Sequence, residues 1–132
     1  HAEHNLLHIY EKDLAKVYPK ILDKESCWNQ AYNITGEEVL TAEQYLGFIA
    51  NHLKKELFIT YLPQAELDTI NYIQPFEFNL ISDISKIQEN IGVELTPFKT
   101  WMSETIDWYV NVYDGSDSKG YDKRQLEIGL SK

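Results

Sequence analysis

The stretch AYNITGEEVLTAEQYLGFIA, residues 31–50, decides the fold because it contains the clearest helix start in the chain. Thr41 is a good N-cap residue, and Gln44 stands three positions later, where it completes a capping box. Six apolar residues then recur at helical spacing and form one face: Ala42, Tyr45, Leu46, Ile49, Ala50 and Leu53. Before the cap, QAYNIT (30–35) reads as a buried strand closed by Gly36.

Two further segments have strand-like patterns. NLLHIY (5–10) is a short apolar run, and LFITYL (57–62) is rich in β-branched and aromatic residues. Three short strands separated by helices do not make a self-sufficient parallel sheet, because parallel strands must be covered on both faces. We therefore expect a helix-rich α+β fold in which the strands belong to a larger Rossmann-type sheet that continues outside this chain.

Caps and breakers mark the other helices. Apolar spacing predicts a helix from residue 11 to about 24, with a kink or a broken turn at Pro19. Ser82 is the expected cap of a helix that ends at a left-handed Gly92. Thr96, followed by a proline in the first turn, is the expected cap of a long final helix. Shorter helices are predicted at 65–70 and from residue 121 onward.

Length and composition exclude several classes of protein. A chain of 132 residues fits a single domain, 1–132, and no apolar run is long enough to span a membrane. Cys27 is the only cysteine, so an intramolecular disulfide is impossible and we expect a cytoplasmic protein. The net charge of −9 and the dispersed Lys and Arg residues argue against a nucleic-acid surface. The start at His1, without Met, predicts a cut or cloned boundary.

Five motifs follow one another in a recognisable order. They are HIYEKDLA (8–15), AYNITGEEVLTAEQYLGFIA (31–50), LFITYLPQAELD (57–68), FNLISDISKIQENIGVELTPF (78–98) and FKTWMSETIDWYV (98–110). In this order and spacing they resemble the C-terminal third of the NAD-dependent epimerase/dehydratase family, the extended short-chain dehydrogenase/reductases. The tail 113–132 and PFEFN (75–79) are similar to the subgroup that includes chloroplast stem-loop-binding proteins.

The resemblance implies a substrate-binding C-terminal part whose N-terminal cofactor-binding Rossmann domain is absent. The parent would use NAD or NADP on a nucleotide sugar or a related small-molecule substrate. No two of the six glycines lie closer than five residues, so the glycine-rich pyrophosphate turn cannot be built. None of the nine tyrosines has Lys four residues later, so we expect no catalytic residue and no cofactor bound by this chain. The chain also departs from the family at Gln64, near the position where an Arg usually binds the diphosphate.

Six residues are candidates for binding a substrate. Four combine aromatic and amide groups on the loop 63–78, and two stand at the end of the strand 30–35, where open α/β sheets bind ligands. They are Asn71, Tyr72, Gln74 and Phe76 on the loop, and Asn33 and Thr35 at the strand end. The alternative, that the loop is a connector packing its own aromatics, is equally weighted.

For three other sets of residues, a structural role is the favoured interpretation. The histidines 1, 4 and 8 could share a metal ion, but a frayed end is the favoured interpretation. Cys27 lacks a neighbouring His that would activate it as a nucleophile. The aromatics of the final helix are expected in the core. They are Trp101, Trp108, Tyr109 and Tyr113.

The missing Rossmann domain is the expected principal partner. Its absence would expose apolar surface, so we expect homo-oligomers, formed by strand pairing through residues 31–35 or 57–62. The alternative functions are an RNA-binding or a protein-interaction module derived from the same family. A concentrated basic face would favour RNA, and the charge balance speaks against one.

Overall fold

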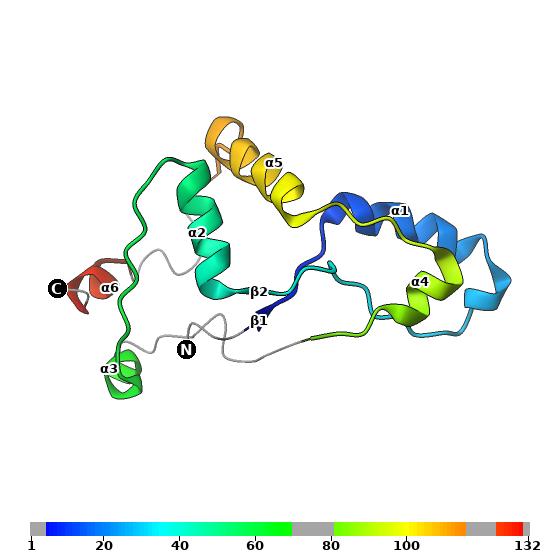
Figure 1. The fold of residues 1–132 in the computed structure, drawn as a ribbon, viewed down its shortest axis with the longest axis horizontal. Helices are drawn as coiled ribbons and strands as arrows, with labels where there is room; N and C mark the ends of the chain where they lie inside the picture. The colour runs from blue at the N-terminus through cyan, green and yellow to red at the C-terminus, as the bar shows by residue number, and fades with distance from the viewer. Residues whose placement is uncertain (1–4, 70–80, 116–123, 131–132) are drawn as a thin grey trace.

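A computed structural model describes residues 5–69, 81–115 and 124–130. The chain forms an elongated, helix-rich structure with one small sheet (Figure 1), so the broad α+β expectation is confirmed. The elements are β1 (Asn5–Leu6), α1 (Glu11–Leu22), the 3₁₀ turn η1 (Glu25–Cys27), β2 (Leu40–Thr41), α2 (Ala42–His52), α3 (Gln64–Thr69), α4 (Ser85–Ile91), α5 (Phe98–Asn111) and α6 (Arg124–Leu130).

The sheet is a single antiparallel pair in the described part of the chain. Asn5 pairs with Thr41 and Leu6 pairs with Leu40, so β1 covers only the start of the strand predicted for residues 5–10. The strands predicted at 30–35 and 57–62 are wrong for this chain, because both segments are irregular. A strand requires a neighbour that completes its hydrogen-bond ladder, and neither segment has one among the described residues.

The start of α2 is confirmed in detail. The Gln44 main-chain N–H donates to Thr41 Oγ1 at 3.2 Å, and the Thr41 N–H donates to Gln44 Oε1 at 2.9 Å, which completes the capping box. Both bonds are local, so they need no tertiary context. The apolar face of α2 then packs against α5 through Tyr45, Phe48 and Ile49.

The ends of α1 and α4 agree only in part with the sequence expectations. α1 runs through Pro19 to Leu22, so the expected break is wrong; the proline costs the helix one N–H donor, but the helical bonding continues beyond it, because the Asp23 N–H donates to the Pro19 carbonyl at 3.0 Å. Gly92 ends α4 with φ of 65°, as predicted. Ser82 does not cap α4, because the Asp83 carboxylate accepts from the N–H of Ser85 at 2.9 Å and from its hydroxyl at 2.6 Å.

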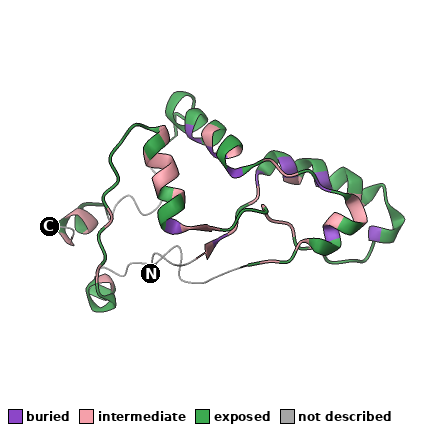
Figure 2. Cartoon of the chain, viewed as in Figure 1, coloured by how far each residue is buried: buried purple, intermediate pink, exposed green. Residues whose placement is uncertain are grey.

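Two separate apolar clusters hold the helices together. The first joins α1 to α4 and is built on Val17, Ile87 and Val93. The second joins α2 to α5 and is built on Phe98, Met102 and Ile106. Buried residues are accordingly few and spread along the length of the molecule (Figure 2).

A buried carboxylate links the two clusters. Asp13, in the first turn of α1, is 1% exposed and accepts from the main-chain N–H of Thr96 at 2.6 Å and from its hydroxyl at 2.8 Å. The Thr96 hydroxyl is therefore not the cap of α5, whose N-cap residue is Pro97, and that expectation is wrong. Burial alone would raise the pKa of Asp13, but the bonds from Thr96 and Lys16 outweigh it and hold the pKa below its usual value.

The molecule leaves an unusual amount of surface open. Its accessible surface is 9969 Å², whereas a compact monomer of its mass would expose roughly 7200 Å². Large apolar side chains contribute, among them Phe58 at 80% and Leu22 at 68% exposure. Within the described residues, no helix combines the length and the apolar character needed to cross a membrane.

Candidate functional site

The predicted substrate-binding residues fall into two groups. Asn71, Tyr72, Gln74 and Phe76 lie outside the described residues. Asn33 and Thr35 lie on the irregular segment 30–35, which runs between η1 and β2. Asn33 is exposed, and its side-chain amide donates to the main-chain oxygen of Asp83 at 3.4 Å, which ties the segment to the residues before α4.

Burial alternates along this segment as it would on a strand. Tyr32 and Ile34 pack on the α1–α4 cluster, whereas Ala31 and Asn33 are exposed. Among the described residues, the main chain of 30–35 makes no backbone–backbone hydrogen bond, and only the Ala31 oxygen accepts a bond, from Lys86 Nζ at 3.0 Å. The segment therefore has the side-chain pattern of a strand with an open hydrogen-bonding edge.

Two buried hydroxyls on the segment lack conventional partners among the described residues. They are Thr35 Oγ1 and the Tyr32 hydroxyl. The Cys27 thiol near Tyr32, together with burial, raises the pKa of the phenol. An unsatisfied buried hydroxyl costs about 1–3 kcal/mol, so the Thr35 hydroxyl, which has no such neighbour among the described residues, is the one that calls for a polar partner.

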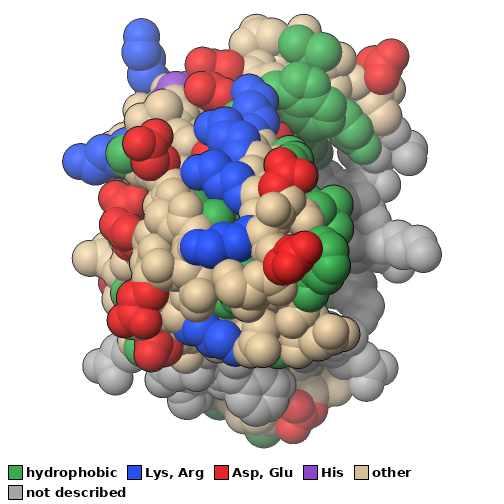
Figure 3. Space-filling view, turned by 90° about the vertical axis from the view of Figure 1, so that its right-hand side faces the viewer, with side chains coloured by type: hydrophobic (Ala, Val, Ile, Leu, Met, Phe, Trp, Pro, Cys, Tyr) green, Lys and Arg blue, Asp and Glu red, His purple; other side chains and the backbone are tan. Residues whose placement is uncertain are grey.

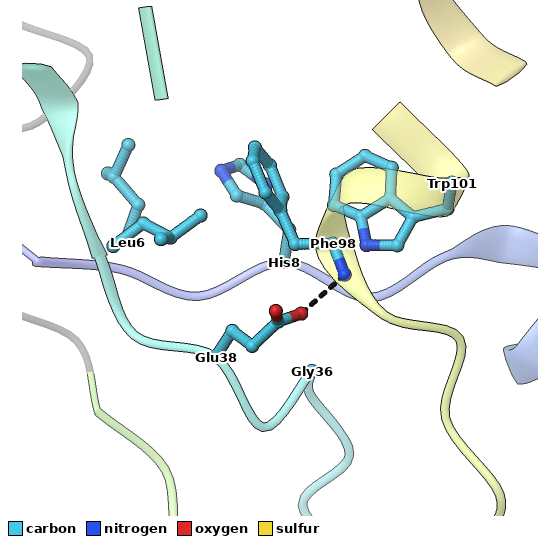
Figure 4. A pocket seen from close by; sticks show the side chains of 7 residues that line it. Leu6, His8, Gly36, Glu38, Phe98 and Trp101 are labelled. Atoms are coloured by element: carbon cyan, nitrogen blue, oxygen red, sulfur yellow. Dashed lines mark hydrogen bonds between the residues drawn. The ribbon is translucent and has the colours of Figure 1, made fainter. Parts of the chain in front are cut away.

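A second candidate is the junction between the sheet and α5 (Figure 4). Seven residues line a small hollow there: Leu6, His8, Gly36, Glu38, Leu40, Phe98 and Trp101. The hollow has room for about one water molecule. That space is far too small for a nucleotide or a sugar, so the junction in this form is not a substrate pocket.

The polar groups of the junction hold the chain together. The Gly36 N–H donates to the His8 carbonyl at 2.5 Å, and a Cβ at Gly36 would lie 2.7 Å from that same oxygen, so only glycine fits there without a shift. The Glu38 carboxylate accepts from the Phe98 N–H at the start of α5, where a negative charge is favourable (Figure 4).

His8 is held among aromatic rings. Its ring centroid lies 5.1 Å from that of Tyr45 and 6.2 Å from that of Trp101. Partial burial lowers the pKa of His8, which favours the neutral imidazole. The other two histidines of the expected trio, His1 and His4, lie outside the described residues, and no metal-binding group of three His, Cys, Asp or Glu occurs within them.

The exposed fractions of the side chains decide the roles expected for Cys27 and for the aromatic residues of α5. Cys27 is 2% exposed, which does not suit a nucleophile that must meet a substrate. Trp101 packs partly in the α2–α5 cluster, as expected. Trp108 and Tyr109 are at least half exposed and Tyr113 is 41% exposed, so the core expectation is wrong for these three residues.

A row of four lysines was not predicted from the sequence, because they are four residues apart rather than adjacent. They are Lys12, Lys16, Lys20 and Lys24. Basic side chains gather on the end of the molecule formed by α1 and α4, with acidic side chains on both sides (Figure 3). Lys20 Nζ donates to the Gly92 carbonyl at 3.3 Å, and Lys24 Nζ donates to the Asn90 carbonyl, so both cap the C-terminus of α4. Lys16 forms an ion pair with Asp13 of α1, and Lys12 forms one with Glu104 of α5.

Four of the described helices have an N-cap residue other than glycine. The N-cap residues of α1, α2, α4 and α5 are Tyr10, Thr41, Ile84 and Pro97, so none of these helices begins at a glycine that would let a pyrophosphate approach the backbone. No protein-family model, curated protein or solved structure matches the chain.

Proposed function

We propose that this chain is the substrate-binding part of an NAD(P)-dependent epimerase, dehydratase or reductase, and that residues 30–35 extend the sheet of a separate nucleotide-binding half. The open edge of this segment is the observation that carries the proposal. Tyr32 and Ile34 anchor one side of it to the α1–α4 cluster, and its main chain is left without backbone partners among the described residues. An added strand would use those groups.

The buried Thr35 hydroxyl supports the same proposal. Thr35 was singled out as a substrate-binding candidate because the ends of strands in open α/β sheets bind ligands. Its hydroxyl is buried and has no hydrogen-bond partner among the described residues. Such a group lowers the stability of the fold unless another polar group binds it. That group would come from the nucleotide-binding half or from the substrate.

An RNA-binding function has less support. The row of Lys12, Lys16, Lys20 and Lys24 is the strongest basic feature on the described surface, yet two of its members bond helix carbonyls and two form ion pairs. Acidic side chains flank the row (Figure 3), and the whole chain carries −9. A gel shift with structured RNA at low salt checks this alternative; retardation that salt abolishes would favour it.

The direct test uses a polypeptide extended upstream of His1 to include a glycine-rich strand–turn–helix. In a fluorescence titration with NADH and NADPH, we expect the extended polypeptide to bind one of them and the 132-residue chain to bind neither. Failure of the extended polypeptide to bind either cofactor would contradict the proposal.

Thr35→Val tests the role of the hydroxyl separately. In the 132-residue chain this isosteric change removes an unsatisfied group, so we expect the free energy of unfolding to rise by about 1 kcal/mol. In the extended polypeptide the same change should be neutral or destabilising, because the hydroxyl then has a partner. Thr105→Val is the control, since the Thr105 hydroxyl donates to the Trp101 carbonyl at 2.8 Å and should respond alike in both polypeptides. The same sign of effect for Thr35→Val in both polypeptides would count against the proposal.

A further inference from the structure

The end of α5 presents apolar side chains to solvent on most sides of the helix. Trp108, Tyr109, Val110 and Val112 are 50%, 55%, 60% and 64% exposed, and together they form the α5 terminal patch. At about 100° per residue, these side chains span an arc of roughly 200°. A helix end that is apolar over so wide an arc is normally enclosed by other protein.

Charges around the patch carry both signs. α5 has no basic residue in its last turn, so the partial negative charge of its C-terminus has no cation of its own helix, and Asp107 adds to it. His52 Nε2 lies 2.8 Å from Asp107 Oδ1, which brings the end of α2 beside α5 (Figure 1). Lys54 and Lys55 follow within three residues of His52. One end of the molecule thus combines an apolar patch, an acidic helix end and a lysine pair.

The acidic helix end and the lysine pair carry opposite charges, as an interface between two identical surfaces requires. A twofold axis through the patch brings the same surface of both copies together, so the acidic group of each copy can face the basic group of the other. We propose that the α5 terminal patch is a homodimer interface, in which the α5 ends of two copies pack together and Lys54 and Lys55 of each copy face the partner's Asp107.

The area of the patch determines how tight such a dimer is. The exposed parts of two aromatic and two valine side chains amount to roughly 400 Å² per copy, about half of the 800 Å² that each partner buries in a standard interface. Leu53 and Leu57, each 38% exposed, lie in and just beyond the turn that ends α2 and add apolar surface. An interface of this size belongs with the weak, transient ones, so the dimer should form only at high protein concentration.

The inference goes beyond the proposed function because it uses a different surface. The proposed sheet extension involves residues 30–35, which pack on the α1–α4 cluster, whereas the patch lies at the end of the α2–α5 pair. It also differs from the strand pairing through 31–35 or 57–62 that the sequence suggested for self-association. Either proposal can fail while the other stands.

Sedimentation velocity of the 132-residue chain, from about 1 to 300 µM, tests the dimer. We expect a monomer–dimer equilibrium, and we expect Val110→Glu to raise the dissociation constant at least about tenfold, because it places a charge in the apolar contact of both copies. Tyr18→Glu is the matched control; Tyr18 is 58% exposed on α1, remote from the patch, and should change the constant by less than about twofold.

A charge exchange tests the pairing across the axis. The double change Lys54→Glu and Lys55→Glu should weaken the dimer, because both sides of the contact are then acidic. Adding Asp107→Lys should restore much of the affinity, because the two sides again carry opposite charges. Far-UV circular dichroism checks that each variant stays folded. A chain that sediments as a monomer at about 300 µM overturns the proposal. So does a Tyr18→Glu variant that weakens the dimer as much as Val110→Glu, or the absence of any rescue by Asp107→Lys.

Discussion

Replacing Asp13 by Asn should weaken the contact between the first turn of α1 and Thr96, just before α5. The carboxylate is 1% exposed and accepts two hydrogen bonds from Thr96 and one from Lys16, at 2.6, 2.8 and 3.2 Å. An amide keeps one acceptor oxygen for the Thr96 N–H, but its NH₂ group forces the Thr96 hydroxyl to accept instead of donate and cannot accept from Lys16 Nζ, so the Lys16 bond and the charge of the acceptor are lost. Hydrogen bonds to a charged group contribute about 1.5–3 kcal/mol each, so we expect Asp13→Asn to lower the free energy of unfolding by about 2 kcal/mol at pH 7.

The pH dependence of this loss identifies its cause. Hydrogen bonds hold the pKa of Asp13 below the ordinary 3.8. A depressed pKa stabilises the folded state at pH values above the unfolded pKa, and that contribution is lost as the pH falls through the folded pKa. The difference between wild type and Asp13→Asn should therefore be full at pH 7 and shrink below about pH 4.

Urea unfolding followed by circular dichroism at pH 7 and pH 3 measures both quantities. Asp23→Asn serves as the control, because Asp23 is exposed at the other end of the same helix and should change stability by less than about 0.5 kcal/mol. A loss below about 0.5 kcal/mol for Asp13→Asn at pH 7 would refute the reasoning, as would a loss that does not depend on pH.

Three further changes probe the junction and the start of α2, each measured by urea unfolding. Gly36→Ala forces a Cβ to 2.7 Å from the His8 carbonyl and should cost about 1–3 kcal/mol, whereas Gly47→Ala, with open space around it inside α2, should stabilise by up to about 1 kcal/mol. Thr41→Ala removes half of the capping box and should cost about 1 kcal/mol. Glu38→Gln weakens the contact with the α5 N-terminus and should cost about 1 kcal/mol, and the exposed Glu37→Gln should cost clearly less. Equal effects of the two glycine substitutions, or of the two glutamate substitutions, would contradict the contacts assigned to Gly36 and Glu38. A Thr41→Ala variant as stable as wild type would contradict the capping box.

Features that depend on local sequence could be predicted. The capping box of α2 needs only Thr41 and Gln44, and the left-handed end of α4 needs only Gly92, so both follow from residues a few positions apart. Where a distant residue competes, the local rule fails. Thr96 is a good cap by sequence, but the buried Asp13, 83 positions away, takes its hydroxyl.

The strands and the candidate site could be predicted only in part. Residues 30–35 have the composition and alternating burial of a strand, but a ladder needs a neighbour that this chain does not provide among its described residues. The same holds for α5, whose apolar stripe predicts burial although Trp108 is 50% exposed. The Thr35 hydroxyl was selected by its position at a strand end, and its lack of a partner could not be known from sequence.

Amide hydrogen exchange along residues 30–35 tests the central claim most directly, that this segment is an edge built to pair with a nucleotide-binding half. In the 132-residue chain these amides have no backbone acceptor among the described residues, so we expect them to exchange nearly as fast as in an unfolded peptide. In the polypeptide extended upstream of His1, the account predicts strong protection of alternate amides in this segment, as in a paired strand. Equally fast exchange in both polypeptides would contradict it.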